Sequence, residues 1–183
     1  MFAWTNTTSV PDSGSGWTQR TLNQGNASLE QPTCWRLPHD TDTIECYFRD
    51  CNQQNIYSAS STDEGESFSV PARTTLPNPG SGIEGCPLDS GDLILIYNPT
   101  SGGSRDPLAA GISSDDGKSW KSRNVQHGPT GVPSAGPNEF SYPTVLQTPD
   151  GNIHVMYTYA PTGVDQAKTM KYIQFSEDWV TSL

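Results

Sequence analysis

The sequence is poor in basic residues and has no long apolar stretch. It has 10 Lys and Arg against 20 Asp and Glu, which gives a formal net charge of −10. The basic residues are scattered, whereas a protein that binds a nucleic-acid backbone needs them clustered, so we expect no nucleic-acid partner. Nowhere does it approach the roughly 18 consecutive apolar residues of a transmembrane helix, so we expect no membrane span. The opening MFAWTNTTSV is too short and too polar for a secretion signal, which indicates a mature or truncated start.

Hydrophobic residues are also scarce, whereas turn formers are abundant. Hydrophobic residues make up only 32% of the chain, and 17 Gly and 15 Pro are spread along its whole length. This composition argues against a helical bundle and favours many short strands. The His and Cys residues do not have the spacing of a metal site, and we expect neither a metal nor another cofactor. The composition therefore predicts an all-β chain, long enough for one domain.

Sequons and cysteines favour the secretory pathway. Asn6 and Asn26 each begin an Asn-x-Ser/Thr triplet, the acceptor pattern for N-glycosylation. The chain has four Cys, and an even number is typical of proteins from oxidising compartments. We therefore expect a glycoprotein that is extracellular or lies at the cell surface.

One eight-residue pattern occurs twice. STDEGESF at 61–68 and SSDDGKSW at 113–120 share the spacing Ser-x-Asp-x-Gly-x-x-aromatic, 52 residues apart. Cys34 and Cys86 are separated by the same interval, which indicates repeated structural units. In each copy the Gly can take positive φ, the Asp can accept backbone N–H groups, and the aromatic residue can pack in the core. We interpret the pattern as a turn that stabilises the fold rather than as a substrate site.

Aligned on this interval, each unit reads as four short antiparallel strands, with the pattern between the third and the fourth. Such a unit describes a β-propeller blade. We expect a single partial propeller over residues 1–183, with an amino-terminal segment and outer strand at 1–30 and blades at 31–75, 83–126 and 140–183. In the last blade the pattern is degenerate, because Ser176, Asp178 and Trp179 have a different spacing.

With two such patterns inside blade-length repeats, the chain resembles the sialidase (neuraminidase) superfamily of Asp-box, or BNR-repeat, β-propellers. The likeness is closest to the sialidase-like BNR group, in LPNPGSGIE (76–84), LILIYNPTS (93–101), RDPLAAGISSDDGKSW (105–120) and EFSYPTVLQTPDGNIHVMYTY (139–159). The resemblance implies a six-bladed propeller of which this chain is the carboxy-terminal half. Because three blades leave open strand edges, we expect either a fragment or a half-ring that a second chain or copy completes.

The resemblance also implies a site for an acidic sugar. Arg49 and Arg105 match two arginines that bind the sugar carboxylate, for which the planar guanidinium is well suited. Tyr142 matches the nucleophile. The family's catalytic Glu corresponds here to Gln31, which can hydrogen-bond a phenol but cannot take its proton. Glu139 is near Tyr142 in the sequence and could substitute.

Three functions remain open. The leading one is sialidase-like processing of an acidic glycan, although the family's first arginine and its acid/base Asp belong to blades that this sequence does not contain. The second is a uronate-polysaccharide lyase with Tyr142 or His154 as base. The third is a non-catalytic glycan-binding or structural glycoprotein, which Gln31 favours. Whether the chain is an enzyme is therefore left undecided.

The blade alignment suggests one set of disulfides. Cys34 and Cys86 occupy equivalent places on neighbouring innermost strands, which favours a bridge between blades. Cys46 and Cys51 would then remain for a local bridge, although an inward-facing Cys46 would forbid that pairing. Three connectivities are possible for two bridges.

Overall fold

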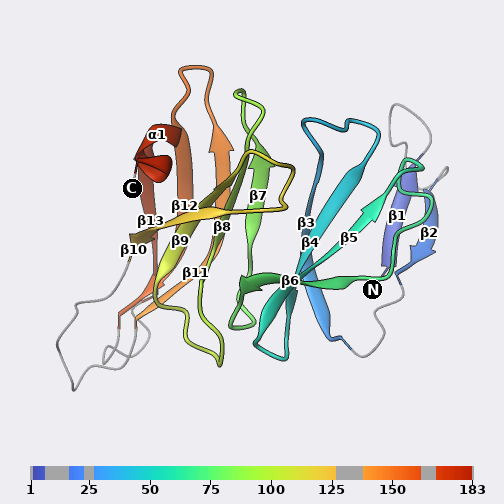
Figure 1. Cartoon of the computed structure of the whole chain (residues 1–183). Helices are drawn as coiled ribbons and strands as arrows, with labels where there is room; N and C mark the ends of the chain where they lie inside the picture. The colour runs from blue at the N-terminus through green and yellow to red at the C-terminus, as the bar shows by residue number, and fades with distance from the viewer. Residues whose placement is uncertain (1, 7–16, 23–26, 127–137, 162–167, 183) are drawn as a thin grey trace.

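The computed structural model describes residues 2–6, 17–22, 27–126, 138–161 and 168–182, and these form strands with one short helix (Figure 1). The predicted all-β class is confirmed. Two sheets have four antiparallel strands each. The first consists of β3 (Leu29–Arg36), β4 (Ile44–Asp50), β5 (Asn55–Ser61) and β6 (Ala72–Pro77), and the second of β7 (Glu84–Pro87), β8 (Leu93–Tyr97), β9 (Leu108–Ser113) and β10 (Lys121–Gln126).

The third sheet has three strands among the described residues and ends in a helix. Its strands are β11 (Glu139–Gln147), β12 (Ile153–Ala160) and β13 (Thr169–Phe175), and α1 (Glu177–Thr181) follows. The degenerate pattern thus begins a helix, because it lacks the Gly that takes positive φ in the two complete patterns. Instead, the Ser176 side chain caps α1 by accepting from the N–H of Trp179. Glu177 and Asp178 add favourable negative charge to the first turn.

The amino-terminal segment forms a hairpin rather than the single outer strand that we expected. β1 (Phe2–Asn6) pairs antiparallel with β2 (Trp17–Thr21). Each strand thereby satisfies backbone N–H and C=O groups of the other, which a lone strand could not do. Of the two sequon asparagines, Asn6 is the last residue of β1, and Asn26 lies outside the described residues.

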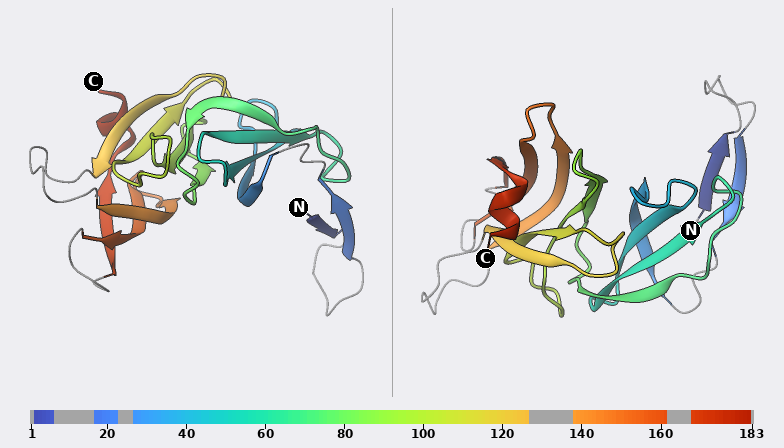
Figure 2. Two further views of the ribbon diagram at one scale, coloured as in Figure 1. Left: turned by 90° about the horizontal axis from the view of Figure 1, so that it is seen from below. Right: turned by 45° about the horizontal axis from the view of Figure 1, so that its top comes forward.

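The three larger sheets follow one another along an arc, as the view from below shows (Figure 2, left). Their first strands are neighbours, because β7 packs against β3 on one side and β11 on the other. The beginnings of β3, β7 and β11 all lie at the lower edge of Figure 1. Loops and side chains at these beginnings therefore share one end of the structure.

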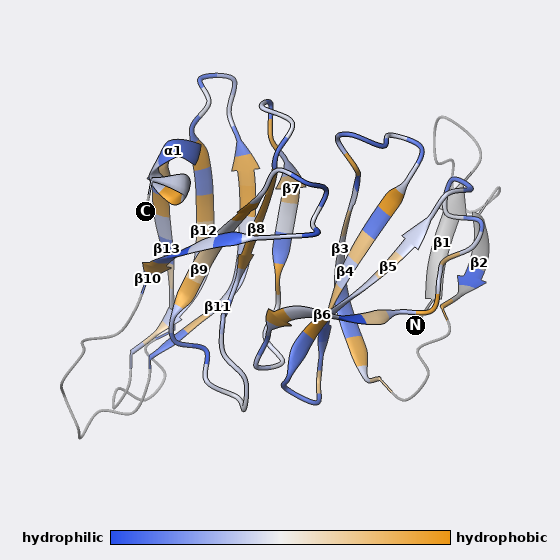
Figure 3. Cartoon of the chain, viewed as in Figure 1, coloured by the Kyte–Doolittle hydropathy of each residue, from blue (hydrophilic) through white to orange (hydrophobic). Residues whose placement is uncertain are grey.

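Apolar residues fill the space between the sheets. All five residues of β8 are buried, and alternate side chains enter different cores. Ile94 and Ile96 face the third sheet, whereas Leu93 and Leu95 face the first. Figure 3 shows the concentration of hydrophobic residues in β8, β9 and β12.

The two eight-residue patterns form nearly identical turns after β5 and β9. In the first, Ser61 Oγ accepts from the Gly65 N–H at 2.9 Å and donates to Asp63 Oδ1 at 2.8 Å. Asp63 also accepts hydrogen bonds from Ser67 through both carboxylate oxygens. In the second, Ser113, Asp115, Gly117 and Ser119 make the same bonds at 2.6 to 2.8 Å. Hydrogen bonds to the carboxylates lower the pKa of Asp63 and of Asp115 to about 2.

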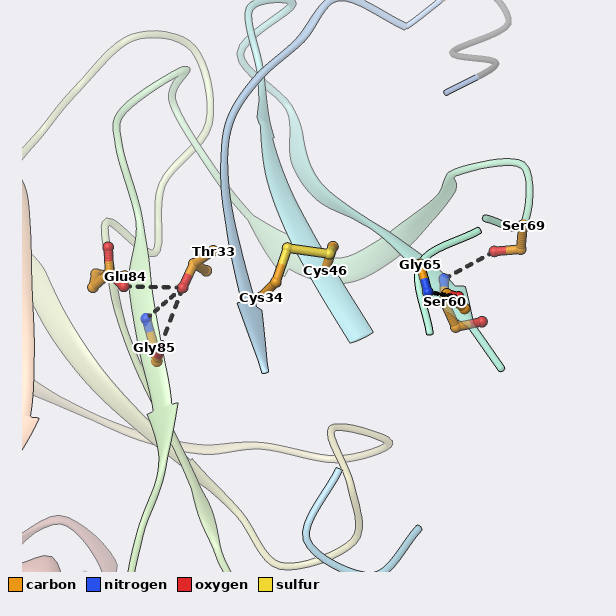
Figure 4. Close-up of a disulfide and its surroundings, with 9 residues drawn as sticks. Thr33, Cys34, Cys46, Ser60, Gly65, Ser69, Glu84 and Gly85 are labelled. Atoms are coloured by element: carbon orange, nitrogen blue, oxygen red, sulfur yellow. Dashed lines mark hydrogen bonds between the residues drawn. A yellow bond between two sulfur atoms is a disulfide. The ribbon is translucent and has the colours of Figure 1, made fainter. Parts of the chain in front are cut away.

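The predicted disulfide pairing is wrong. The structure joins Cys34 to Cys46 (Figure 4). Cys51 and Cys86 are free cysteines. Cys34 and Cys46 lie directly opposite each other on β3 and β4, with their Cα atoms 4.1 Å apart. Side chains alternate along a strand, so it is Thr33 that points to the next sheet, where its hydroxyl bonds Gly85. The bridge therefore lies within one sheet.

The outer face of the third sheet is apolar and exposed. Four large side chains on it are 43 to 55% exposed, namely Leu146, Met156, Met170 and Tyr172. His154 lies on the same face, bonded to Thr148 Oγ1 at 2.9 Å and to the Tyr172 hydroxyl at 2.7 Å. No helix in the described part of the chain is long and apolar enough to cross a membrane.

Candidate functional site

Two residues have unusual backbone conformations, and each lies near the beginning of the first strand of its sheet. Gln31 in β3 has a φ of 46°, and Tyr142 in β11 has a φ of 49°. Each precedes a proline, and each lies where the strand register shifts by a bulge. A non-glycine residue at positive φ costs free energy, and bulges redirect side chains. Gln31 and Tyr142 are therefore held in the same strained arrangement on two strands.

Gly82 lies between these two side chains, just before β7. A Cβ atom built on Gly82 would be 3.0 Å from Cδ1 of Tyr142 and 3.5 Å from Oε1 of Gln31. The glycine therefore leaves the space into which both side chains reach. The structure thus brings together Gln31 and Tyr142, the two residues that correspond in sequence to the catalytic Glu and Tyr of the family that the chain resembles.

Arg105 joins the same cluster. Its guanidinium carbon is 5.3 Å from the centroid of the Tyr142 ring, within the range of a cation–π contact. Nη1 donates to Oε1 of Glu139 at 2.9 Å, and the Arg105 side chain remains 25% exposed. The Arg105 carbonyl accepts from the Phe140 N–H, which ties the loop before β9 to the beginning of β11.

Glu139 is a partly buried, ion-paired residue at the start of β11. Burial acts to raise the pKa of its carboxyl, but a 2.7 Å hydrogen bond from Ser141 and the charges of Arg105 and Lys168 lower it below its ordinary value. Lys168 Nζ is 3.5 Å from the second carboxylate oxygen. Glu139 is therefore ionised at neutral pH, and its contacts position Arg105.

Arg49 is the last residue but one of β4 and is held from two sides. Nη1 donates to the Gly80 carbonyl at 2.6 Å, and Nη2 donates to Oε2 of Glu30, the cross-strand partner of Arg49. Its side chain is 13% exposed. The adjacent Asp50 accepts instead from backbone N–H groups of Ser28 and Asn52, so it does not neutralise Arg49. The segment 80–82 thus contacts Arg49 at one end and Tyr142 at the other.

His154 lies apart from this cluster. It pairs with Leu146, well along β11 from Tyr142, and its ring stacks on Tyr172. As for metals, the described residues contain no group of three or more His, Cys, Asp or Glu side chains placed to bind an ion.

Sequence reasoning missed the residues that support the site. Glu30, Gly80, Gly82, Ser141 and Lys168 were not among the expected residues, although GSG at 80–82 belongs to the segment 76–84 that carries the family resemblance. Glycines just before an innermost strand are a signal for close approach by neighbouring side chains. Glu30, by contrast, could be recognised only from its cross-strand contact with Arg49, and Ser141 only from its hydrogen bond to Glu139 on the same strand.

Comparison with known proteins gives one family and a set of similar folds. Residues 5–155 match the family described as the BNR repeat-like domain. No curated protein matches the chain. Among solved structures, the intramolecular trans-sialidase from Ruminococcus gnavus, in complex with oseltamivir carboxylate, is 22% identical with a TM-score of 0.69, and the match covers 92% of this chain and 37% of that one.

Two further sialidase structures are similar. The leech intramolecular trans-sialidase, complexed with 2,7-anhydro-Neu5Ac, is 18% identical with a TM-score of 0.72, and the NanB sialidase from Streptococcus pneumoniae is 18% identical with a TM-score of 0.69. Each match covers 92% of this chain and 27% of the other. The chain thus spans well under half the length of these structures. It belongs to the family of BNR repeat-like domains, and its sheets are blades of a sialidase-like β-propeller.

Proposed function

We propose that this chain binds an acidic glycan at the shared beginnings of β3, β7 and β11, as part of a sialidase-like propeller. The observation that carries this proposal is the convergence of Gln31 and Tyr142 on Gly82, with the Arg105 guanidinium 5.3 Å from the Tyr142 ring centroid. Strain of this kind is concentrated at functional sites, where the surrounding structure maintains it. An aromatic ring beside an arginine offers a sugar both a stacking surface and a carboxylate partner.

In this proposal Arg49 and Arg105 recognise the sugar carboxylate. Each guanidinium is oriented by a glutamate, Glu30 for Arg49 and Glu139 for Arg105, through one nitrogen. Within the described residues, Arg105 donates side-chain hydrogen bonds from Nη1 alone, so Nε and Nη2 can form the two parallel bonds that a carboxylate accepts. Arg105 is the more exposed of the two, and we assign it the larger contribution.

Gln31 favours binding without hydrolysis as a second candidate function. If Tyr142 attacked a glycosidic carbon, its phenolic proton would need an acceptor, and the neutral amide of Gln31 cannot take it. Glu139 is ionised, but its first carboxylate oxygen is already bonded to Arg105 and Ser141. A lyase reaction with His154 as base has little support, because His154 lies away from the arginines on the outer face of the third sheet.

The test measures binding and turnover separately. Saturation-transfer NMR with 3′-sialyllactose and with tri-galacturonate should show binding of an acidic sugar. Arg105→Ala should weaken it by about 10-fold or more, the usual effect of losing a hydrogen bond to a charged group. Arg36→Ala is the matched control, because Arg36 is an exposed arginine paired with Glu64 at the other end of β3. Equal binding by both variants would disprove the proposed site.

Turnover distinguishes the candidate functions. Release of 4-methylumbelliferone from its sialoside, abolished by Tyr142→Phe, would support hydrolysis, and unsaturated-uronate absorbance would support the lyase. If the wild-type chain binds without turnover, Gln31→Glu tests whether the missing proton acceptor is the cause.

We further propose that additional blades cover the outer face of the third sheet, either from a longer chain or from a second copy. The support is the exposed apolar surface around Met156 and Met170. Light scattering of the purified chain should show self-association, which Met156→Glu should abolish if a second copy is responsible.

The Cys34–Cys46 disulfide supports an extracellular location.

A further inference from the structure

A cavity lies between the first and second sheets, at the end opposite to Tyr142. It has a volume of about 550 Å³, within the range of small-ligand sites. One wall is the face of β4, β5 and β6, and the other is the turn after β9. Its lining includes Glu45, Tyr47, Ser58, Ser60, Lys118 and Trp120. We call it the inter-sheet groove.

Trp120 is the more exposed aromatic side chain of the inter-sheet groove, and the Tyr47 ring, only 3% exposed, packs behind it. The rings of Tyr47 and Trp120 are tilted, with centroids 6.1 Å apart. Trp120 is fixed in place, because its indole N–H donates to the Gly117 carbonyl at 3.0 Å. The Tyr47 hydroxyl donates to the same carbonyl at 3.3 Å. These two hydrogen bonds hold the Trp120 and Tyr47 rings in place without a ligand. We call the two rings the aromatic platform.

The turn after β9 does not require a tryptophan in order to form. At the equivalent position of the first turn, Phe68 packs against the core around Phe48. A phenylalanine therefore suffices to anchor such a turn. Trp120, in contrast, both packs against the core and lines the inter-sheet groove. The larger indole adds aromatic surface where the groove is open.

A carboxyl group faces the platform. Glu45 is two residues before Tyr47 on the same face of β4, and burial raises the pKa of its carboxyl, partly offset by a hydrogen bond with Ser58. Tyr47, Ile56 and Leu76 form the apolar core of this face, so the core does not need the Glu45 side chain. A half-buried carboxyl that packing does not need is suited to accept hydrogen bonds from a ligand.

We propose that the inter-sheet groove is a second glycan site, which binds a neutral pyranose. The apolar face of a pyranose matches the Trp120 indole, and its hydroxyls match Glu45 and the serine hydroxyls of β5. An anionic sugar is disfavoured, because the three acidic residues of the lining, Glu45, Asp40 and Asp116, outnumber its two basic residues, Arg73 and Lys118. The two sites would lie at opposite ends of the same blades, one for an acidic and one for a neutral sugar.

The first experiment is saturation-transfer NMR of the full chain with the methyl glycosides of galactose, glucose, mannose and N-acetylglucosamine. A ligand of about 13 non-hydrogen atoms at ordinary ligand efficiency gives a Kd of about 1 mM, which this method detects. We expect at least one of the four to bind. Absence of transfer for all four would overturn the proposal.

Two variants locate the bound sugar. Trp120→Phe reproduces the residue of the first turn, so the fold should persist, and it should weaken binding about 3- to 10-fold. Glu45→Gln keeps the shape but removes the charge, and it should weaken binding about 5-fold. The matched control is Glu177→Gln, since Glu177 is also a partly buried carboxyl bonded to a serine, Ser90, but lies on α1. Unchanged affinity in both groove variants would overturn the proposal.

The neutral-sugar site and the proposed acidic-sugar site can be tested separately. Arg105→Ala should leave binding of the neutral glycoside unchanged, and Trp120→Phe should leave binding of 3′-sialyllactose unchanged. Loss of neutral-sugar binding in Arg105→Ala would place that sugar at the acidic site and refute the second site.

Discussion

The strained conformation of Tyr142 can be tested by replacing it with glycine and, separately, with alanine. Both variants lose the same ring, with its contacts to Arg105 and Gly82, so the difference between them reports the backbone alone. At a φ of 49° alanine keeps the strain of the left-handed region and glycine relieves it. The comparison therefore isolates the free energy stored at this position.

The expected difference is small but has a definite sign. A non-glycine residue in the left-handed region costs roughly 1–2 kcal/mol. Glycine loses more backbone entropy on folding, which costs roughly 0.5–1 kcal/mol relative to alanine. The balance makes Tyr142→Gly more stable than Tyr142→Ala by about 0.5–1 kcal/mol.

Equilibrium urea unfolding of both variants measures this difference. The matched control is Tyr172, an exposed tyrosine on β13 of the same sheet, with ordinary strand backbone. There the sign should reverse, and Tyr172→Gly should be less stable than Tyr172→Ala by about 0.5–1 kcal/mol. If glycine is the worse residue at both positions by the same margin, Tyr142 is not strained and the argument from strain to function fails.

Three further predictions concern stability. Cys34→Ser should lower the free energy of unfolding by about 3 kcal/mol, because the bridge closes a loop with a sequence separation of 12; Cys86→Ser, at a free thiol, should have a much smaller effect in the same urea titration. The folded state lowers the pKa of Asp115 to about 2 from 3.8. The ionised carboxylate therefore stabilises the folded state above pH 3.8, and this stabilisation is lost as the pH falls toward 2. Asp115→Asn should therefore flatten the fall in urea midpoint between pH 4 and pH 2, and an unchanged slope would contradict this. Burial raises the pKa of Glu45, so the protonated carboxyl favours the folded state at low pH. This stabilisation is lost as the pH rises through the raised pKa. Glu45→Gln should hence raise the melting temperature at pH 7 relative to wild type, with a smaller gain at pH 4, and a gain that does not depend on pH would show that ionisation is not the cause.

Much of the fold could be predicted from local sequence. The side-chain hydrogen bonds of Ser61 and Asp63 within the turn join residues no more than four positions apart, so the turn is recognisable from spacing. The same holds for the second copy of this turn. The degenerate third pattern became a helix, which the Ser cap and two following acidic residues could have indicated. The helix that follows β13 was therefore partly within reach of sequence reasoning.

The candidate site could be predicted residue by residue but not as an arrangement. Resemblance to a family pointed to Gln31, Arg105 and Tyr142, and nearness in the sequence pointed to Glu139. The structure places all four at one end of the blades. Their contacts depend on two bulges and on the gap at Gly82, which are properties of the packed sheets. No local pattern in the sequence states which side chain a bulge redirects.

The sequence by itself determined the strand content, the repeated turns and the continuous apolar run that is buried on both faces in β8, because these depend on neighbours within a few residues. Only the tertiary structure decided that Cys34 bonds Cys46, that Gln31 and Tyr142 meet over Gly82, and that Trp120 lines the inter-sheet groove. Each of these contacts joins different strands or sheets. Strand pairing and sheet packing set such distances, and residues far apart in the chain carry no local signal of them.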